Sequence, residues 1–89
     1  MRTGVNDRDH YTVALQALAV SLGDEARAGR LLSLTGLTPD DLRERAGEAD
    51  VLVAVLRFLE DHEPDLLAVA ETLGRKPQEL VAARSALEA

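Results

Sequence analysis

The sequence predicts an all-α fold, a compact bundle of five or six short helices in two similar three-helix halves. Apolar residues recur at the three- and four-residue spacing of an α-helix along most of the chain. The core must consist mainly of Leu, Val and Ala, because Tyr11 and Phe58 are the only aromatic residues. This composition favours close packing between helices. Glycine and proline residues divide the apolar segments at positions typical of helix ends and starts.

The first predicted helix follows a polar segment that has no helical period. We predict that residues 1–7 are a flexible N-terminal arm and that residues 8–89 are a single helical domain. The helix begins at Arg8 and ends at Gly23. Apolar side chains surround most of its circumference, which predicts a central position in the bundle. These side chains are Tyr11, Val13, Ala14, Leu15, Ala17, Leu18, Val20 and Leu22.

Capping residues predict the next two helices. Asp24 can accept hydrogen bonds from the free amides of a second helix, which ends at Gly36 in a left-handed conformation. Thr38 and Pro39 begin a third helix, because a threonine side chain caps the first turn and proline fits the first helical position. The third helix ends at Gly47.

The second half of the chain contains three further predicted helices. Residues 50–61 predict a helix that is apolar on nearly every side. A strand is the competing prediction for residues 51–59, which are rich in β-branched side chains, but the length of the run and the spacing of its leucines favour a helix. Pro64 begins a fifth helix that Gly74 ends, and Pro77 begins a sixth.

The two halves, about residues 8–47 and 48–89, resemble each other. Residues 12–46 align with residues 50–84 without a gap. We interpret this as an internal duplication, because helix ends and starts coincide as well as apolar residues. The first helices of the two halves should then pack together at the centre of the fold. The matched pairs include Val13 with Val51, Leu18 with Leu56, Glu25 with Glu63, Gly36 with Gly74, Pro39 with Pro77 and Leu42 with Leu80.

Composition limits the classes of function. The chain has no cysteine, so neither disulfides nor thiolate metal ligands are available to it. A formal net charge of −6 disfavours a surface that follows phosphate backbones. Neither a membrane-spanning apolar run nor a signal peptide is recognisable, so we expect a soluble cytoplasmic protein. A small aliphatic core also leads us to expect a homodimer.

The order of segments resembles a known family. The segments ALQALAVSLGDEARAGRLLSLTGLTPDDLRERA and LVAVLRFLEDHEPDLLAVAETLG, followed by a helix that begins with proline, carry the resemblance. Its most specific part is LTGLTPDDLR, residues 34–43. The chain is similar to small alphaproteobacterial proteins that are catalogued as a domain of unknown function. The resemblance implies a short, all-helical bacterial protein and supplies no activity, ligand or site residue.

Residues 66–87 predict an alternative function, a helix-turn-helix-like DNA-binding regulator. A glycine turn separates two helices whose facing positions are small or apolar, as in DNA-binding helix pairs. The candidate DNA contacts are Arg75, Lys76, Gln78 and Arg84. Two features oppose this interpretation. Arg75 stands where the motif usually has an apolar residue, and the second helix offers Arg84 as its only cation, whereas counterion release requires several phosphate contacts.

Metal and catalytic sites are not predicted. The segment EDHEPD, residues 60–65, combines a histidine with carboxylates that zinc could use, but its spacing matches no metal motif. Acidic residues are also common where a helix begins, because free N–H groups there favour negative charge. The hydroxyl residues have no general base in a recognisable context, so we predict neither an enzyme nor a cofactor. These residues are Ser21, Ser33, Thr35 and Ser85.

A protein-interaction or regulatory module is the function that remains. The chain is small, acidic and helical, and its Leu and Val content is high enough to leave an apolar patch between the halves. We expect a protein partner, and we expect its contact surface in the groove between the halves, beside the two Gly-x-x-Pro joints at Gly36 and Gly74.

Overall fold

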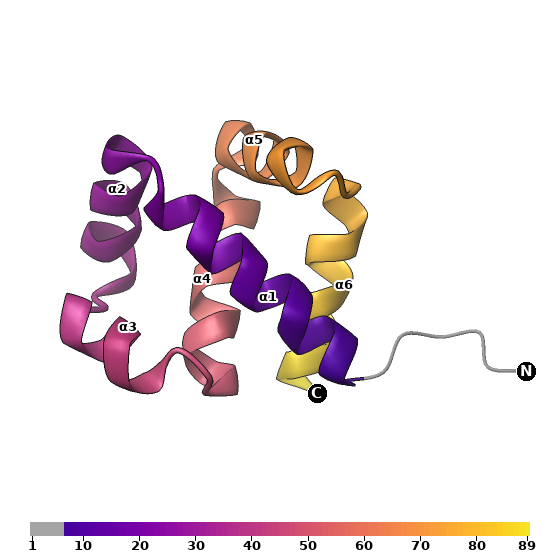
Figure 1. Cartoon of the computed structure of the whole chain (residues 1–89), viewed down its shortest axis with the longest axis horizontal. Helices are drawn as coiled ribbons and strands as arrows, with labels where there is room; N and C mark the ends of the chain where they lie inside the picture. The colour runs from indigo at the N-terminus through magenta and orange to yellow at the C-terminus, as the bar shows by residue number, and fades with distance from the viewer. Residues whose placement is uncertain (1–6) are drawn as a thin grey trace, which may run out of the picture.

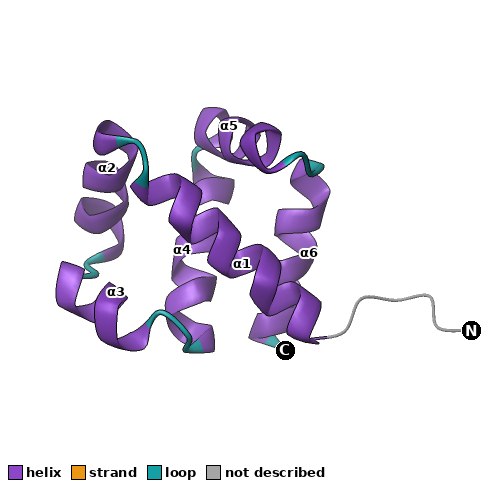
Figure 2. Ribbon diagram, viewed as in Figure 1, coloured by secondary structure: helices purple, strands orange, loops and turns teal. Residues whose placement is uncertain are grey.

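The computed structural model describes residues 7–89, and every regular element in this part of the chain is an α-helix (Figure 2). The all-α prediction is therefore confirmed, including the helical prediction for residues 51–59. Residues 1–6 of the predicted arm lie outside the described residues, and Asp7 already belongs to the first helix. The helices are α1 (Asp7–Leu22), α2 (Glu25–Thr35), α3 (Pro39–Arg45), α4 (Ala49–Asp61), α5 (Glu63–Leu73) and α6 (Pro77–Glu88).

Local signals set the helix ends as predicted. Gly36 and Gly74 follow α2 and α5 with φ angles of 78° and 69°, in the left-handed region where glycine has no steric penalty. Thr38 precedes α3, and its hydroxyl accepts a hydrogen bond of 3.0 Å from the Asp41 N–H. The Asp41 carboxylate accepts a hydrogen bond of 2.9 Å from the Thr38 N–H in return, which completes a capping box. The same joint is therefore used twice, once in each half.

Helices α1 and α4 form the centre of the bundle. Figure 1 shows α1 lying across α4 and α6, with α5 across one end of this layer and α2 and α3 at the side. Both α1 and α4 contact α2, α5 and α6, and they also contact each other. Leu18 and Leu56, which the alignment pairs and which belong to these two helices, are both buried. The core is aliphatic apart from Phe58, and it consists of Val13, Ala14, Ala17, Leu18, Leu31, Leu42, Val51, Leu52, Val55, Leu56, Phe58, Leu59, Leu66, Val69, Ala70, Leu80 and Ala83.

The predicted central position of α1 is confirmed, but one apolar strip of the helix is exposed. Leu15 and Leu22 are 41% and 40% exposed, and Ala19 between them is also exposed. These residues occur at helical spacing and share one face of α1. The other helices cover the opposite faces of α1, and no further element of residues 7–89 covers this strip.

The third helices of the two halves differ in their packing. Leu42 of α3 and its matched residue Leu80 of α6 are both buried. The two helices differ in their neighbours, because α6 packs against α1, α4 and α5 and α3 has no comparable contacts. The halves therefore share helix order and turns but not the environment of the last helix. The alignment also places Arg27 on Asp65, and these two side chains form an ion pair with each other. The internal duplication stays a prediction.

A leucine truncation tests the central position of α4. Leu56→Ala should lower the free energy of unfolding by about 2–5 kcal/mol, because the side chain is fully buried and truncation leaves a cavity. Leu67→Ala is the matched control, since Leu67 is 47% exposed and its truncation should change stability by less than about 0.5 kcal/mol. Urea unfolding of both variants measures the difference. Equal effects would show that α4 is not central.

Candidate interaction surfaces

Helices α5 and α6 have the local features of a helix-turn-helix pair. Gly74 forms the turn, and Ala70, Leu80 and Ala83 are buried at the facing positions. Buried small and apolar residues at these positions allow two helices to approach closely. The geometry of the turn is thus compatible with the alternative function, and the charged side chains decide whether the surface suits DNA.

The four candidate DNA contacts do not form one basic surface. Arg75 is directed towards Glu79 and α1, with distances of 3.0 Å from Nη1 to the Glu79 carboxylate and 3.2 Å from Nε to Gln16. Arg84 is directed towards α4 and the end of α6, with carboxylate oxygens of Glu60 and Glu88 both 2.8 Å from its nitrogens. The two arginines therefore lie on different flanks of α6.

The remaining two candidate contacts, Lys76 and Gln78, are exposed at the start of α6. The solvent face of that helix contributes Glu79, Ala82 and Ser85. An exposed face with one carboxylate and small neutral side chains has little attraction for a phosphate backbone.

Arginine side chains throughout residues 9–89 are engaged by carboxylates of the same chain. A phosphate group would have to compete with these carboxylates, so little counterion release is available to stabilise a complex with DNA. The hydrogen bond to Glu60 and, to a smaller extent, the one to Glu88 raise the pKa of the Arg84 guanidinium above its ordinary value. The ion pairs are Arg27 and Arg30 with Asp65, Arg43 with Asp40, Arg45 with Asp41, Glu48 and Asp50, Arg57 with Glu88, Arg75 with Glu79, and Arg84 with Glu60 and Glu88.

The most buried of these ion pairs joins α2 to α5. Asp65 accepts hydrogen bonds of 2.7 and 2.8 Å from Arg30 Nη2 and of 3.0 Å from Arg27 Nε. The Asp65 side chain is only 8% exposed, and Arg30 is about half exposed. Burial by itself would raise the pKa of Asp65, but the hydrogen bonds from Arg30 and Arg27 outweigh it and hold the pKa below its ordinary value.

The acidic segment of residues 60–65 is therefore not a single cluster. Its side chains are directed to different partners: Glu60 to Arg84, and Asp65 to the two arginines of α2. His62 lies against Phe58, with its Nδ1 2.8 Å from the Phe58 carbonyl oxygen and the ring centroids 4.8 Å apart. No group of three His, Asp or Glu residues in the described part of the chain is arranged to hold a metal ion.

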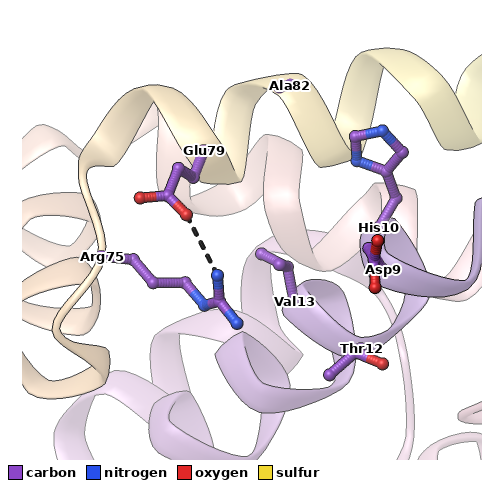
Figure 3. Close-up of a pocket in the computed structure, with 7 residues that line it drawn as sticks. All are labelled: Asp9, His10, Thr12, Val13, Arg75, Glu79 and Ala82. Carbon is purple, nitrogen blue, oxygen red and sulfur yellow. Dashed lines mark hydrogen bonds and ion pairs between the residues drawn. The ribbon is translucent and has the colours of Figure 1, made fainter. Parts of the chain in front are cut away.

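Two pockets lie between the halves, each beside one of the Gly-x-x-Pro joints. The first has a volume of about 190 Å³ and lies between α1 and the start of α6 (Figure 3). Figure 3 shows Arg75 and Glu79 at one end, His10 and Asp9 at the other, and Val13 between them. A backbone hydrogen bond from Lys76 and a second bond from Arg75 hold the pKa of Glu79 below its ordinary value. The opposite charges of Arg75 and Glu79, at one end of this pocket, are thus paired with each other.

The second pocket is a groove between the end of α2 and one flank of α4, and we call it the α2–α4 groove. Its volume is about 210 Å³. Leu34 lines one side of the groove and is 60% exposed, more than Leu15, Leu22 or Leu67. The residues that form the α2–α4 groove are Leu34, Thr35, Ala54, Arg57, Phe58, Asp61 and His62.

The sequence located this groove only in outline. The predicted contact surface lies between the halves beside both Gly36 and Gly74, and residues 34 and 35 of this groove precede Gly36. The exposure of Leu34 depends on how α2 packs against α4, which no local pattern specifies. The partners of Asp65 were missed for the same reason, since they are 35 and 38 residues away in the sequence.

Replacing Asp65 tests the ion pair between α2 and α5. The pKa of Asp65 is lower in the folded protein than in the unfolded chain. The ionised carboxylate therefore stabilises the fold fully above the unfolded-state pKa of about 3.9, and this stabilisation is lost as the pH falls through the lower folded-state pKa. Asp65→Asn should therefore reduce the free energy of unfolding by about 2 kcal/mol near pH 7, between the values for surface and buried pairs. The difference from the unmodified protein should shrink below about pH 4. Urea unfolding at both pH values measures it, with the exposed Asp61→Asn as the control, and a difference that is independent of pH would contradict the account.

Comparisons with known proteins support the resemblance found in the sequence. A family model matches residues 7–89, which is the whole of the described chain. Comparison with curated proteins and with solved structures gave no match. No helix within residues 7–89 is long and apolar enough to cross a membrane. The chain belongs to the family described as "Protein of unknown function (DUF3572)".

Proposed function

We propose that this protein is a small non-catalytic module that binds another protein through the α2–α4 groove. The observation that supports the proposal is an open groove with the exposed Leu34 at its side and Ala54 and Phe58 in its wall. Large apolar side chains left exposed beside a hollow are typical of protein contact sites. A bacterial cytoplasmic location, an alphaproteobacterial source and the absence of a cofactor are parts of the same proposal.

The paired arginines favour this proposal over DNA binding. Each arginine of the described side chains already contacts a carboxylate. Lys76 is exposed, but a single lysine gives a weak and strongly salt-dependent attraction. One observation favours the DNA-binding alternative: a glycine turn at Gly74 joins two helices whose Ala70, Leu80 and Ala83 are buried, as in a helix-turn-helix.

Two of the four candidate hydroxyl groups support a non-catalytic role. Ser21 is buried and donates a hydrogen bond of 2.7 Å to the Ala17 carbonyl oxygen. Thr35 donates to the Leu31 carbonyl oxygen at 2.6 Å. Both hydroxyls therefore satisfy the backbone of their own helix, whereas a nucleophile needs a general base within hydrogen-bonding reach.

One paired experiment tests the proposal against its alternative. The purified protein is titrated with mixed-sequence duplex DNA at low salt, where even a weak DNA-binding protein shows itself. In parallel, the protein and its Leu34→Glu and Leu67→Glu variants are used as baits in a cell lysate. We expect no DNA binding and a retained protein that Leu34→Glu loses and Leu67→Glu keeps. Both leucines are exposed, and only Leu34 lines the groove, so comparison of the two variants isolates the effect of a charge in the groove.

Two results would contradict the proposal. DNA binding that Lys76→Glu abolishes would establish the helix-turn-helix alternative, because the Lys76 side chain is exposed and its replacement leaves the core intact. Equal retention by the two leucine variants would remove the α2–α4 groove from the contact surface. Circular dichroism of every variant shows whether the helices are preserved.

A further inference from the structure

We infer that the α2–α4 groove binds the same groove of a second copy of this chain, about a two-fold axis. This inference rests on the proposed function and names its partner. Two features of the groove carry it, one of shape and one of charge.

The shape of the groove is self-complementary. Leu34 projects from the end of α2 beside a hollow of about 210 Å³ whose wall includes Ala54 and Phe58. In a two-fold contact each copy supplies both the projecting leucine and the hollow. Each Leu34 would then lose its exposure to water, which is favourable in proportion to the apolar area removed.

The charges along the groove are self-complementary as well. Arg57 and Asp61 line the groove from positions one helical turn apart on α4, and their signs are opposite. When two α4 helices lie antiparallel about a two-fold axis, Arg57 of each copy faces Asp61 of the other. A contact between two copies would therefore contain two ion pairs between these residues.

Neither charge is prevented from making this contact. Asp61 is exposed and forms no ion pair within the described part of the chain, whereas most other charged groups near it are paired. Arg57 contacts Glu88 of α6, but its side chain is still 57% exposed. A guanidinium has five N–H donors, so Arg57 can keep its contact with Glu88 and also donate to a carboxylate of a second copy.

Other exposed features do not identify an occupant in this way. The strip of Leu15 and Leu22 on α1 is apolar, and nothing beside it indicates the chemistry of a covering surface. The pocket beside Arg75 and Glu79 has its charges paired within the chain. The α2–α4 groove alone among these offers a projecting side chain, a hollow and two opposite charges in one place.

The contact should be weak. Stable interfaces bury about 800 Å² on each partner, and a single groove with one projecting leucine provides less. We expect dissociation constants of roughly 10 μM to 1 mM and a concentration-dependent equilibrium between monomer and dimer.

Sedimentation equilibrium of the full chain up to about 1 mM tests the inference. The unmodified protein should form dimers, and Leu34→Glu should raise the dissociation constant by roughly tenfold or more because a charge would replace the apolar side chain that enters the hollow. Leu67→Glu adds the same charge elsewhere and should leave the dissociation constant unchanged.

A charge exchange gives the most specific result. Arg57→Asp puts acids opposite each other in its own dimer, and Asp61→Arg puts arginines opposite each other, so each variant alone should dissociate roughly tenfold more readily. In an equimolar mixture, the first variant has an acid at both positions and the second has an arginine at both. Every facing pair between the two variants is then of opposite charge, and dimers should return.

The outcomes separate the inference from the proposed function. A monomer at every concentration, or a mixture that stays monomeric while the unmodified protein dimerises, would overturn the inference. If the chain is monomeric but the lysate bait loses its partner with Leu34→Glu, the groove binds a different protein and only the inference fails. If the chain dimerises and Leu34→Glu has no effect, the dimer uses another surface and the inference is wrong.

Discussion

The need to cover α4 governs this structure. Six of its side chains are buried, namely Val51, Leu52, Val55, Leu56, Phe58 and Leu59. A helix with so much buried apolar surface cannot remain in water, so α1, α2, α5 and α6 all pack against it. With no cysteine and few aromatic residues, the chain has no other comparable source of stability. Helix α3 contributes one side chain, Leu42, to the core, and the rest of this short helix is polar and peripheral.

Ion pairs organise what lies outside that core. Arg27 and Arg30 hold Asp65 and so join α2 to α5, while Arg84 joins α6 to Glu60 of α4. The arginine side chains of residues 9–89 are consequently paired with carboxylates of the same chain. This arrangement weakens their attraction to phosphate, and Leu34 is the most exposed of the large apolar side chains in this part of the chain.

The sequence predicted the features that depend on local chemistry. The left-handed glycine at Gly36 and the capping box at Thr38 involve only neighbouring residues, so their signals are complete within a few positions. The exposure of Leu15 and the burial of Asp65 depend on which distant helix lies alongside, and helical periodicity carries no such information. For the same reason the sequence indicated a groove between the halves but not the residues that form it.

Native-state hydrogen exchange tests most directly whether α4 holds both halves together. The account predicts that amides in the buried turns of α1, α4 and α6 exchange only through one common unfolding event with the highest free energy, because these helices bury each other. Amides of α3 should exchange through local opening at a lower free energy. If residues of α1 and α2 were protected independently of those of α4 to α6, the halves would be separate folding units, and the central role of α4 would be contradicted.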